Sequence, residues 1–267
     1  MIMNKMFRGL VAMAITSFLC GTVAAQDVLK PHDTTDSDIR ARVDGSIEWE
    51  PVRDLSVEAE FQLRMRDNFS SVDRLQTTLS LNYEVGDYFA IGADYVLING
   101  RNNRNDGWEK PRHRINANFE GSVRVGCVEL SLRERLQTTF RTDSVNHFEK
   151  SDPALILRSK LEAEYHIRHS KWSPYVLFEL HNTLNAPAVV YNYKQAELSY
   201  DNYVTRYRVG AGVKYRISHN HRLEFYYIFD YDRSIKIDYK GNLGYLKSYV
   251  RENEMRHIFG ISYKFKL

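Results

Sequence analysis

The sequence predicts an all-β protein, an antiparallel transmembrane β-barrel of about twelve strands, with about ten strands as the alternative. Three observations support this class. Apolar and polar side chains alternate with period two in most segments between turn residues. Aromatic side chains gather on the apolar face, and the links between segments alternate between short and long. A soluble β-sandwich would also alternate, but burying so many tyrosine hydroxyls in its core would be costly.

Residues 1–25 have the layout of a secretory signal peptide. Lys5 and Arg8 precede an apolar stretch over residues 9–19, and a run of small residues ends at Ala25. The apolar stretch is too short for a spanning helix, which needs about 20 apolar residues. We therefore expect export through the inner membrane and cleavage after Ala25.

Cleavage would change the charge and the cysteine content of the chain. The formal net charge of +3 falls to +1 when Lys5 and Arg8 are removed, so the charge does not indicate a nucleic-acid partner. Cys20 would leave with the signal peptide, because the residues before it are too bulky for a lipid-attachment signal. Cys127 alone cannot form an intramolecular disulfide, so hydrogen-bonded strands must hold the fold together.

The barrel is expected over residues 39–267, after an N-terminal segment at residues 26–38 that is either a first strand or flexible. In the first clear strand Val43, Ile47 and Trp49 lie on one face, and charged residues lie on the other. The same alternation recurs along the whole chain. It predicts about eleven segments, near residues 40–49, 55–66, 74–85, 89–98, 112–123, 127–140, 155–167, 174–182, 203–217, 222–231 and 255–267.

An odd number of strands conflicts with the even numbers of bacterial single-chain barrels. We therefore expect a twelfth strand in one of two places. The first is residues 26–38, an option weakened by their Asp- and Thr-rich composition. The second is a hairpin arm within residues 232–254, where Ile235, Ile237 and Tyr239 alternate with polar residues.

The lengths of the links indicate the orientation of the barrel. Short links follow the first, third, fifth, seventh and ninth segments, whereas longer polar links tend to follow the others. Bacterial barrels have short periplasmic turns and long outer loops. The long links should therefore face the cell exterior; they span residues 99–111, 142–154, 182–202 and 232–254.

The C-terminal strand has the pattern of a second targeting signal. Large apolar side chains occupy every second position from Phe259 to Leu267. Gly260, followed by Tyr263 and Phe265, is similar to the terminal sorting signal read by the barrel-assembly machinery of Gram-negative bacteria, although Ile258 stands where that signal usually has a polar residue. We therefore expect location in the cell outer membrane, with outer-membrane lipid and the assembly machinery as partners.

Several short motifs resemble one family of small outer-membrane barrels. They are Arg64–Phe69, Val72–Arg74, Pro111–Arg114, Leu132–Arg135, Arg158–Leu161 and Pro174–Glu179. In this order and spacing they resemble the domain-of-unknown-function 2490 family, over roughly residues 39–267. The resemblance implies a fold and a location, with no established activity and no catalytic residue.

The polar face of the strands would line the lumen with charges of both signs. These lumen-facing residues are Glu58, Glu60, Arg64, Arg66, Arg74, Arg112, Arg114, Arg133, Arg135, Arg158, Glu162, Glu164, Arg206, Arg208, Arg216 and Glu224. In so narrow a barrel an arginine surplus would favour passage of small anionic solutes. Pairs such as Arg206/Arg208 and Arg112/Arg114 would suit carboxylate or phosphate groups. The alternative is a closed structural or surface-binding barrel filled by Arg–Glu salt bridges.

We expect no enzymatic activity, no cofactor and no metal site. A lipid hydrolase of the outer membrane would need a Ser, a His and an acidic or amide partner, but Ser262, which has His257 nearby, should face the lumen. His219 and His221 lie in a turn without carboxylate or thiolate neighbours that could complete a metal site. A soluble periplasmic lipid carrier with a closed barrel is the third class that fits the alternation.

Overall fold

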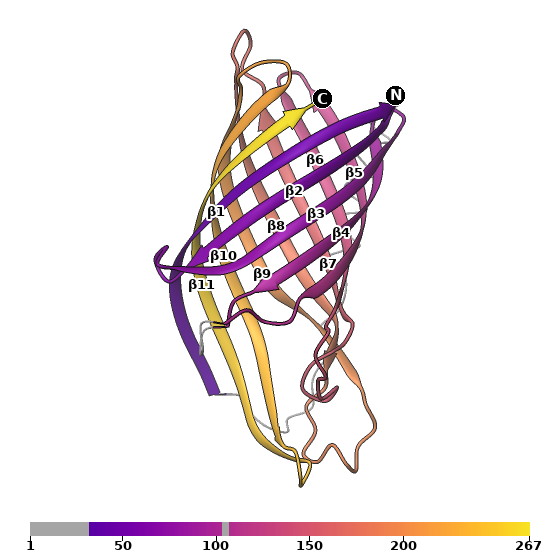
Figure 1. Ribbon diagram of the computed structural model, residues 1–267, viewed down its shortest axis with the longest axis vertical. Helices are drawn as coiled ribbons and strands as arrows, with labels where there is room; N and C mark the ends of the chain where they lie inside the picture. The colour runs from indigo at the N-terminus through magenta and orange to yellow at the C-terminus, as the bar shows by residue number, and fades with distance from the viewer. Residues whose placement is uncertain (1–31, 103–106) are drawn as a thin grey trace.

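The computed structural model describes residues 32–102 and 107–267 and shows a closed β-barrel (Figure 1). The expected signal peptide, residues 1–25, lies outside the described residues. Within them eleven strands form the wall. They are β1 (His32–Val52), β2 (Leu55–Arg66), β3 (Ser71–Val85), β4 (Phe89–Gly100), β5 (Arg112–Val125), β6 (Val128–Phe140), β7 (Ala154–Tyr165), β8 (Trp172–Pro187), β9 (Tyr200–Arg216), β10 (His221–Lys240) and β11 (Tyr245–Lys266).

The strands follow one another around the barrel in chain order. Each pairs with the next in antiparallel orientation. The ring closes between β1 and β11, which run parallel, with Val43 opposite Ile261 and Ile47 opposite Phe265. In Figure 1 the indigo β1 and the yellow β11 lie side by side and point the same way.

The expectation of twelve or ten strands is wrong, because the barrel of described residues has eleven. Antiparallel neighbours reverse direction at every step, so a closed ring with an odd number of strands must contain a parallel pair. The seam between β1 and β11 is that pair. Neither place considered for a twelfth strand holds one in the described chain, since residues 32–38 begin β1 and residues 232–240 end β10. The first strand therefore starts before the boundary expected at residue 39.

The alternation expected from the sequence divides the side chains between two faces of the wall. Exposed apolar residues on the outer face come from every part of the ring; they include Val43, Phe61, Leu79, Ile91, Ile115, Leu136, Leu161, Val176, Val209, Phe225 and Phe259. Inner-face neighbours are mostly polar and buried, with a few buried apolar side chains such as Ile98 and Ile258 among them. On β9, for example, Val209 is 55% exposed and the adjacent Arg208 is 6% exposed. The barrel thus has an apolar outside and a charged inside.

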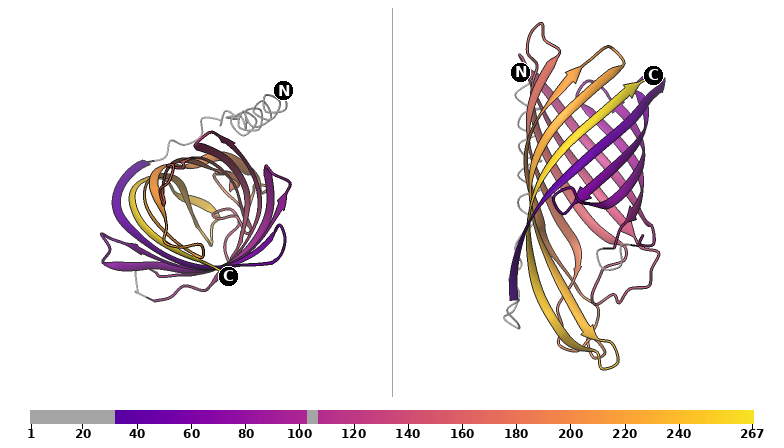
Figure 2. Two further views of the ribbon diagram at one scale, coloured as in Figure 1. Left: turned by 90° about the horizontal axis from the view of Figure 1, so that it is seen from above. Right: turned by 60° about the vertical axis from the view of Figure 1, so that its left-hand side comes forward.

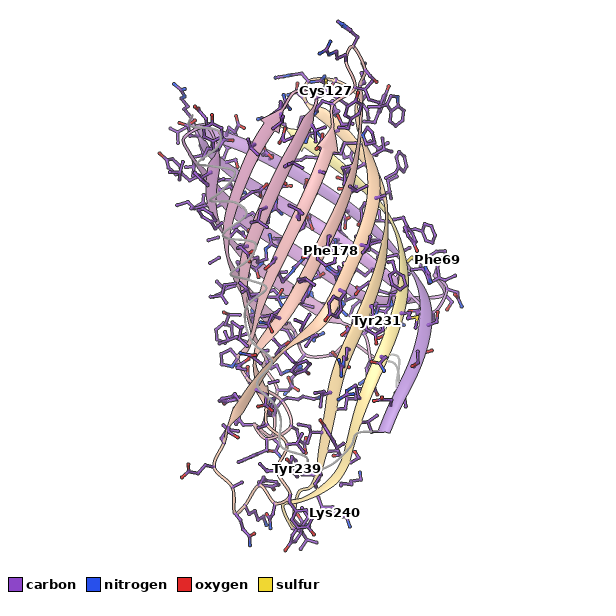
Figure 3. All side chains as sticks on the ribbon, turned by 180° about the vertical axis from the view of Figure 1, so that it is seen from behind. Phe69, Cys127, Phe178, Tyr231, Tyr239 and Lys240 are labelled. Carbon is purple, nitrogen blue, oxygen red and sulfur yellow. The ribbon has the colours of Figure 1, made fainter. Side chains whose placement is uncertain are left out.

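The two ends of the barrel differ in their connections. At the turn end the links are short and comprise residues 53–54, 86–88, 126–127, 166–171 and 217–220. At the loop end they comprise residues 67–70, 101–111, 141–153, 188–199 and 241–244. Figure 3 shows Cys127 at the turn end and Tyr239 and Lys240 at the loop end. The expected alternation of short and longer links is confirmed for most of the chain.

The strands β10 and β11 continue beyond the rest of the wall at the loop end (Figure 2). Residues 232–254, expected to form a long polar loop, are instead the far part of the β10–β11 hairpin, with its turn at residues 241–244. The loop prediction is wrong here because Ile235 and Ile237 keep pairing, opposite Arg251 and Tyr249. The observed alternation of these residues lengthens two strands and adds no new one.

Two long links pack against this hairpin extension. The Tyr239 hydroxyl donates a hydrogen bond to the Val190 carbonyl at 3.0 Å, and the Tyr239 backbone N–H donates to the Glu149 carboxylate at 3.1 Å. The Tyr193 ring lies 5.3 Å from both the Tyr239 and the Phe148 rings, measured between centroids. The loop end is therefore a packed cluster of links and hairpin.

Candidate functional site

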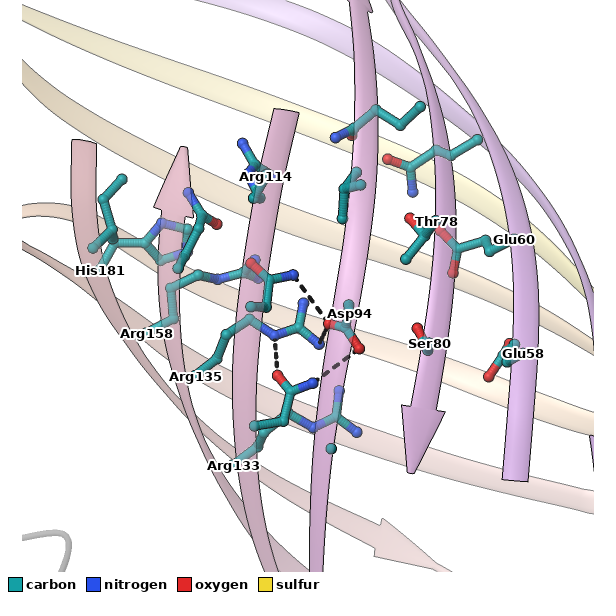
Figure 4. Close-up of a pocket in the computed structure, with 18 of the residues that line it drawn as sticks. Glu58, Glu60, Thr78, Ser80, Asp94, Arg114, Arg133, Arg135, Arg158 and His181 are labelled. Carbon is teal, nitrogen blue, oxygen red and sulfur yellow. Dashed lines mark hydrogen bonds and ion pairs between the residues drawn. The ribbon is translucent and has the colours of Figure 1, made fainter. Parts of the chain in front are cut away.

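The interior of the barrel gathers most of the charged residues that the sequence assigns to it. A cavity of about 470 Å³ is lined by Glu58, Glu60, Arg64, Arg74, Arg114, Arg133, Arg135, Arg158, Arg206 and Arg208, among others (Figure 4). Nearer the turn end, Glu162, Glu164 and Glu224 line a second, smaller space. Arg66 and Arg112 lie at the loop end of β2 and β5, and Arg216 is exposed at the turn end of β9.

One side of the interior carries charges of alternating sign. Glu179 on β8, Arg208 on β9, Asp230 on β10 and Arg256 on β11 lie opposite one another in register. The Arg208 guanidinium lies 3.0 Å from the Glu179 carboxylate and 3.1 Å from that of Asp230. The Asp230 side chain is 1% exposed. A buried charge is tolerated only when it is paired, and this alternating row supplies each charge with its partner.

Arg206 joins the same network, which changes the role expected for the Arg206/Arg208 pair. It forms an ion pair with Asp232 and lies 3.5 Å from the Asp230 carboxylate. Both arginines are therefore neutralised within the wall and have little charge left for a solute. Sequence reasoning missed these acidic partners, although Asp230 and Asp232 occupy polar positions of the alternating segment that forms β10.

Asp94 on β4 organises another side of the cavity, as the dashed lines in Figure 4 show. Its carboxylate accepts hydrogen bonds from the side-chain amides of Asn116 and Asn118, each at 3.0 Å, and lies 3.1 Å from the Arg135 guanidinium. Next to it, Arg133 pairs with Glu120 at 2.6 Å. The charges of Arg133 and Arg135 are therefore also neutralised by protein groups.

Lysines supply the partners of several interior glutamates. The Lys214 ammonium lies 2.8 Å from Glu162 and 2.6 Å from Glu164. Lys264 on the closing strand lies 2.9 Å from Glu58 on β2. The sequence-based set of lumen residues contained no lysine, because it followed the arginine-rich strands and left the partners of the glutamates open.

A second row of the wall consists of arginines alone. Arg42 on β1 lies opposite Arg64 on β2, and Arg64 lies opposite Arg74 on β3. Arg74 pairs with its chain neighbour Asp73 at 2.7 Å. Among residues 32–102 and 107–267, neither Arg42 nor Arg64 has a carboxylate within 4.0 Å. Arg42 was absent from the predicted set, although it lies on the polar face of the first alternating segment.

The ion pairs of the described chain follow the wall and leave the centre of the cavity unbridged. Each of these ion pairs that links two strands joins either neighbouring strands or two strands with a single strand between them. The widest steps include Arg135 with Asp94, across β5, and Lys214 with Glu162, across β8. The cross-lumen salt bridges that would fill a closed barrel are therefore not seen between described residues.

Along several strands the two signs of charge are segregated. On β2, Glu58 and Glu60 lie toward the turn end and Arg64 toward the loop end. On β7, Glu162 lies toward the turn end and Arg158 toward the loop end. The part of the cavity nearer the loop end is thus richer in arginine.

The serine and histidine considered for a hydrolase lie apart, and the described residues hold no cluster for a metal ion. Ser262 and His257 lie on opposite faces of β11, and the His257 ring nitrogen Nδ1 lies 2.8 Å from the Tyr227 hydroxyl on the outer face. Within residues 32–102 and 107–267 no group of three or more His, Cys, Asp or Glu could hold a metal ion. No helix in this part of the chain is long and apolar enough to cross a membrane.

Fold and interior together define the class: a closed, mainly antiparallel β-barrel with an apolar outer face and a charged lumen. The model of the family described as "Protein of unknown function (DUF2490)" matches residues 41–240, and the chain belongs to this family. The family resemblance seen in the motifs is thereby confirmed. The comparisons with curated proteins and with solved structures gave no match.

Proposed function

We propose that this protein is an outer-membrane β-barrel that serves as a narrow passive route for small, preferentially anionic solutes. The observation that carries the proposal is the interior cavity, which no ion pair between described residues bridges and whose wall holds arginines without a described carboxylate partner. Rings of fixed charge select permeating ions by sign, so Arg42, Arg64 and Arg114 would favour anions.

The outer face supports a membrane location. A soluble monomer rarely exposes a contiguous apolar patch of more than a few hundred Å², whereas this barrel exposes large apolar side chains on strand after strand around the ring. Every strand has at least 12 residues, more than the roughly 9–11 that cross a bilayer at a tilt. The signal-like residues 1–25 and the apolar C-terminal strand point to the same compartment.

The second candidate is a closed structural or surface-binding barrel. It is favoured by the ion-paired wall of β8 to β11, where Asp230 is 1% exposed and Arg208 is 6% exposed. That network stiffens one side of the interior and narrows it. We prefer the channel because the adjoining wall of β1 and β2 carries Arg42 and Arg64, which have no carboxylate partner among the described residues.

Conductance of the refolded protein in a planar bilayer tests the proposal directly. We expect discrete conductance steps with anion preference in a salt gradient, and a weaker preference when Arg42→Gln and Arg64→Gln are combined. Arg216→Gln, which removes an exposed arginine at the turn end of β9, is the matched control and should keep the selectivity. Folding is checked first by heat-shifted gel mobility.

Two results would count against this function. An absence of conductance from folded protein would favour the closed barrel, with the loop end as the next place to test for function. Recovery of the native protein in the periplasmic fraction, with no partition into outer membranes, would overturn the membrane location itself and favour a soluble carrier.

A further inference from the structure

The row formed by Arg42, Arg64 and Arg74 is an energetically unusual arrangement. These residues lie directly opposite one another on three adjacent strands, and like charges placed opposite each other destabilise a sheet. The row of Glu179, Arg208 and Asp230 shows that the same barrel can alternate charges at equivalent positions. The arginine row is therefore a departure from the pairing used elsewhere in the wall.

Arg74 in this row has Asp73 as its partner, whereas Arg42, Arg64 and the nearby Arg114 form no ion pair with another described residue. Arg64 donates a hydrogen bond only to the neutral side chain of Gln62 among the described residues, and Arg114 donates to the Thr139 hydroxyl at 3.2 Å. Arg64 is repelled by the charges of Arg42, Arg74, Arg114 and Arg208. Arg42, Arg64 and Arg114 together thus bring roughly three positive charges that no carboxylate of residues 32–102 and 107–267 offsets at ion-pair distance.

All three arginines border the same space. Arg42, Arg64 and Arg114 line the interior cavity of about 470 Å³. In the same cavity Arg133 and Arg135 have Glu120 and Asp94 as partners. The cavity therefore combines arginines that the protein neutralises with arginines that it leaves to be neutralised from outside.

We propose that Arg42, Arg64 and Arg114 form a binding site for the phosphate group of a small soluble solute. A phosphate carries a charge near −2 at neutral pH and three acceptor oxygens, so it can accept hydrogen bonds from several guanidinium groups at once. A monocarboxylate would offset only one of the three charges. The site lies inside the wall, away from the lipid-facing side chains, so the ligand is a solute and not a lipid headgroup.

This site deepens the proposed passage and rests on it for the entry of solute, yet binding can be measured without conduction. The experiment is calorimetric titration of the refolded mature chain in detergent with inorganic phosphate, with acetate at the same ionic strength as the comparison anion. The variants are Arg42→Gln with Arg64→Gln, and Arg133→Gln with Glu120→Gln as the control. The control removes an arginine of the same cavity together with the carboxylate that offsets its charge at 2.6 Å, so the net charge is unchanged.

We expect phosphate to bind more tightly than acetate, and the double variant to weaken phosphate binding roughly tenfold or more, the scale of one lost charge-assisted hydrogen bond. The control double variant should change the affinity much less. Equal weakening by the control, equal affinity for acetate, or no phosphate binding by folded protein would each overturn the site. Phosphate binding without conductance would reject the proposed channel and support the phosphate site. Anion conductance without phosphate binding would support the channel and reject the phosphate site.

Discussion

The ring of Tyr226 occupies the space beside Gly260 that a β carbon on that residue would fill. The two residues lie opposite each other on β10 and β11. From this position the Tyr226 hydroxyl donates a hydrogen bond to the Asp44 carboxylate on β1 at 2.8 Å. A glycine in the closing strand thus lets a tyrosine reach across that strand and tie β10 to β1.

Replacing Gly260 with alanine should destabilise the barrel, because the new methyl group would displace the Tyr226 ring and break its hydrogen bond to Asp44. Overpacking of this kind costs about 1–3 kcal/mol, measurable as a shift of the urea unfolding curve in detergent. Gly45→Ala is the control, since a β carbon at Gly45 would meet nothing within 4 Å. Equal stability of the two variants would show that the ring contact does not matter.

Replacing Asp230 with asparagine should be more damaging. Asp230 lies within ion-pair distance of Arg206, Arg208 and Arg256, and removing one partner of a buried pair costs about 3–5 kcal/mol because charge is left uncompensated. Unfolding curves again measure the effect. Asp238→Asn, in the solvent-exposed pair with Lys247 at the loop end, should leave the curve nearly unchanged. A small effect at Asp230 would mean that water enters this wall freely.

The faces of the strands could be predicted from the sequence, but the closure of the ring could not. Whether Val43 or Arg42 faces out follows from a local period of two, which any short segment reveals. The parallel pairing of Val43 with Ile261 joins segments at opposite ends of the chain, and no local pattern reports it. The even-number rule of bacterial barrels therefore led to the wrong count.

The lumen was predictable in composition and not in pairing. Period two places Arg64 and Arg208 on the inner face alike. Their partners depend on register, and shifting a strand changes every cross-strand neighbour. The register puts Arg208 between Glu179 and Asp230, and Arg64 between Arg42 and Arg74. Only the structure could therefore distinguish the arginines that pair with carboxylates in the wall from those without a carboxylate partner among the described residues.

Disulfide cross-linking tests the parallel seam. With Cys20 and Cys127 replaced by serine, Val43→Cys and Ile261→Cys should form a disulfide, because these residues lie opposite each other on adjacent strands and neighbouring strands are about 4.8 Å apart. Mass spectrometry of the linked peptides detects the product. An inserted twelfth strand would separate the two positions and abolish it.

The control for this experiment places the second cysteine two residues away from the position that lies opposite Val43. Val43→Cys with Phe259→Cys keeps both side chains on the outer face but separates their α carbons by about 8 Å, beyond the about 7 Å that a disulfide spans. Efficient linking of this pair and not of the first would show that the register differs from that described.

Removing the Tyr239 ring should loosen the loop end. Burial raises the pKa of the Tyr239 hydroxyl, so it stays protonated at neutral pH and donates to the Val190 carbonyl. Tyr239→Ala removes this bond and the contact with the Tyr193 ring. We expect faster proteolysis of residues 188–199, with Lys240→Ala, at the exposed adjacent position, as the control. Unchanged cleavage would mean that the links are held by other contacts.

Replacing Tyr263 and Phe265 with asparagine should reduce assembly in the cell. Both residues belong to β11, near its turn end, and the His221 ring stacks on them, with its centroid 4.9 Å from that of Phe265. The change removes the aromatic part of the terminal signal and this cross-strand stack together, so less heat-shifted barrel should accumulate in outer membranes.

Two further variants separate signal recognition from simple loss of stability. Leu243→Asn, an exposed position in the β10–β11 turn, controls for the added polarity and should assemble normally. His221→Ala removes the stack while keeping both aromatics of β11. If His221→Ala assembles as poorly as the double variant, the defect lies in barrel stability. If it assembles normally and the double variant does not, the aromatics act through recognition of the C-terminal strand; normal assembly of the double variant would reject the sorting-signal interpretation.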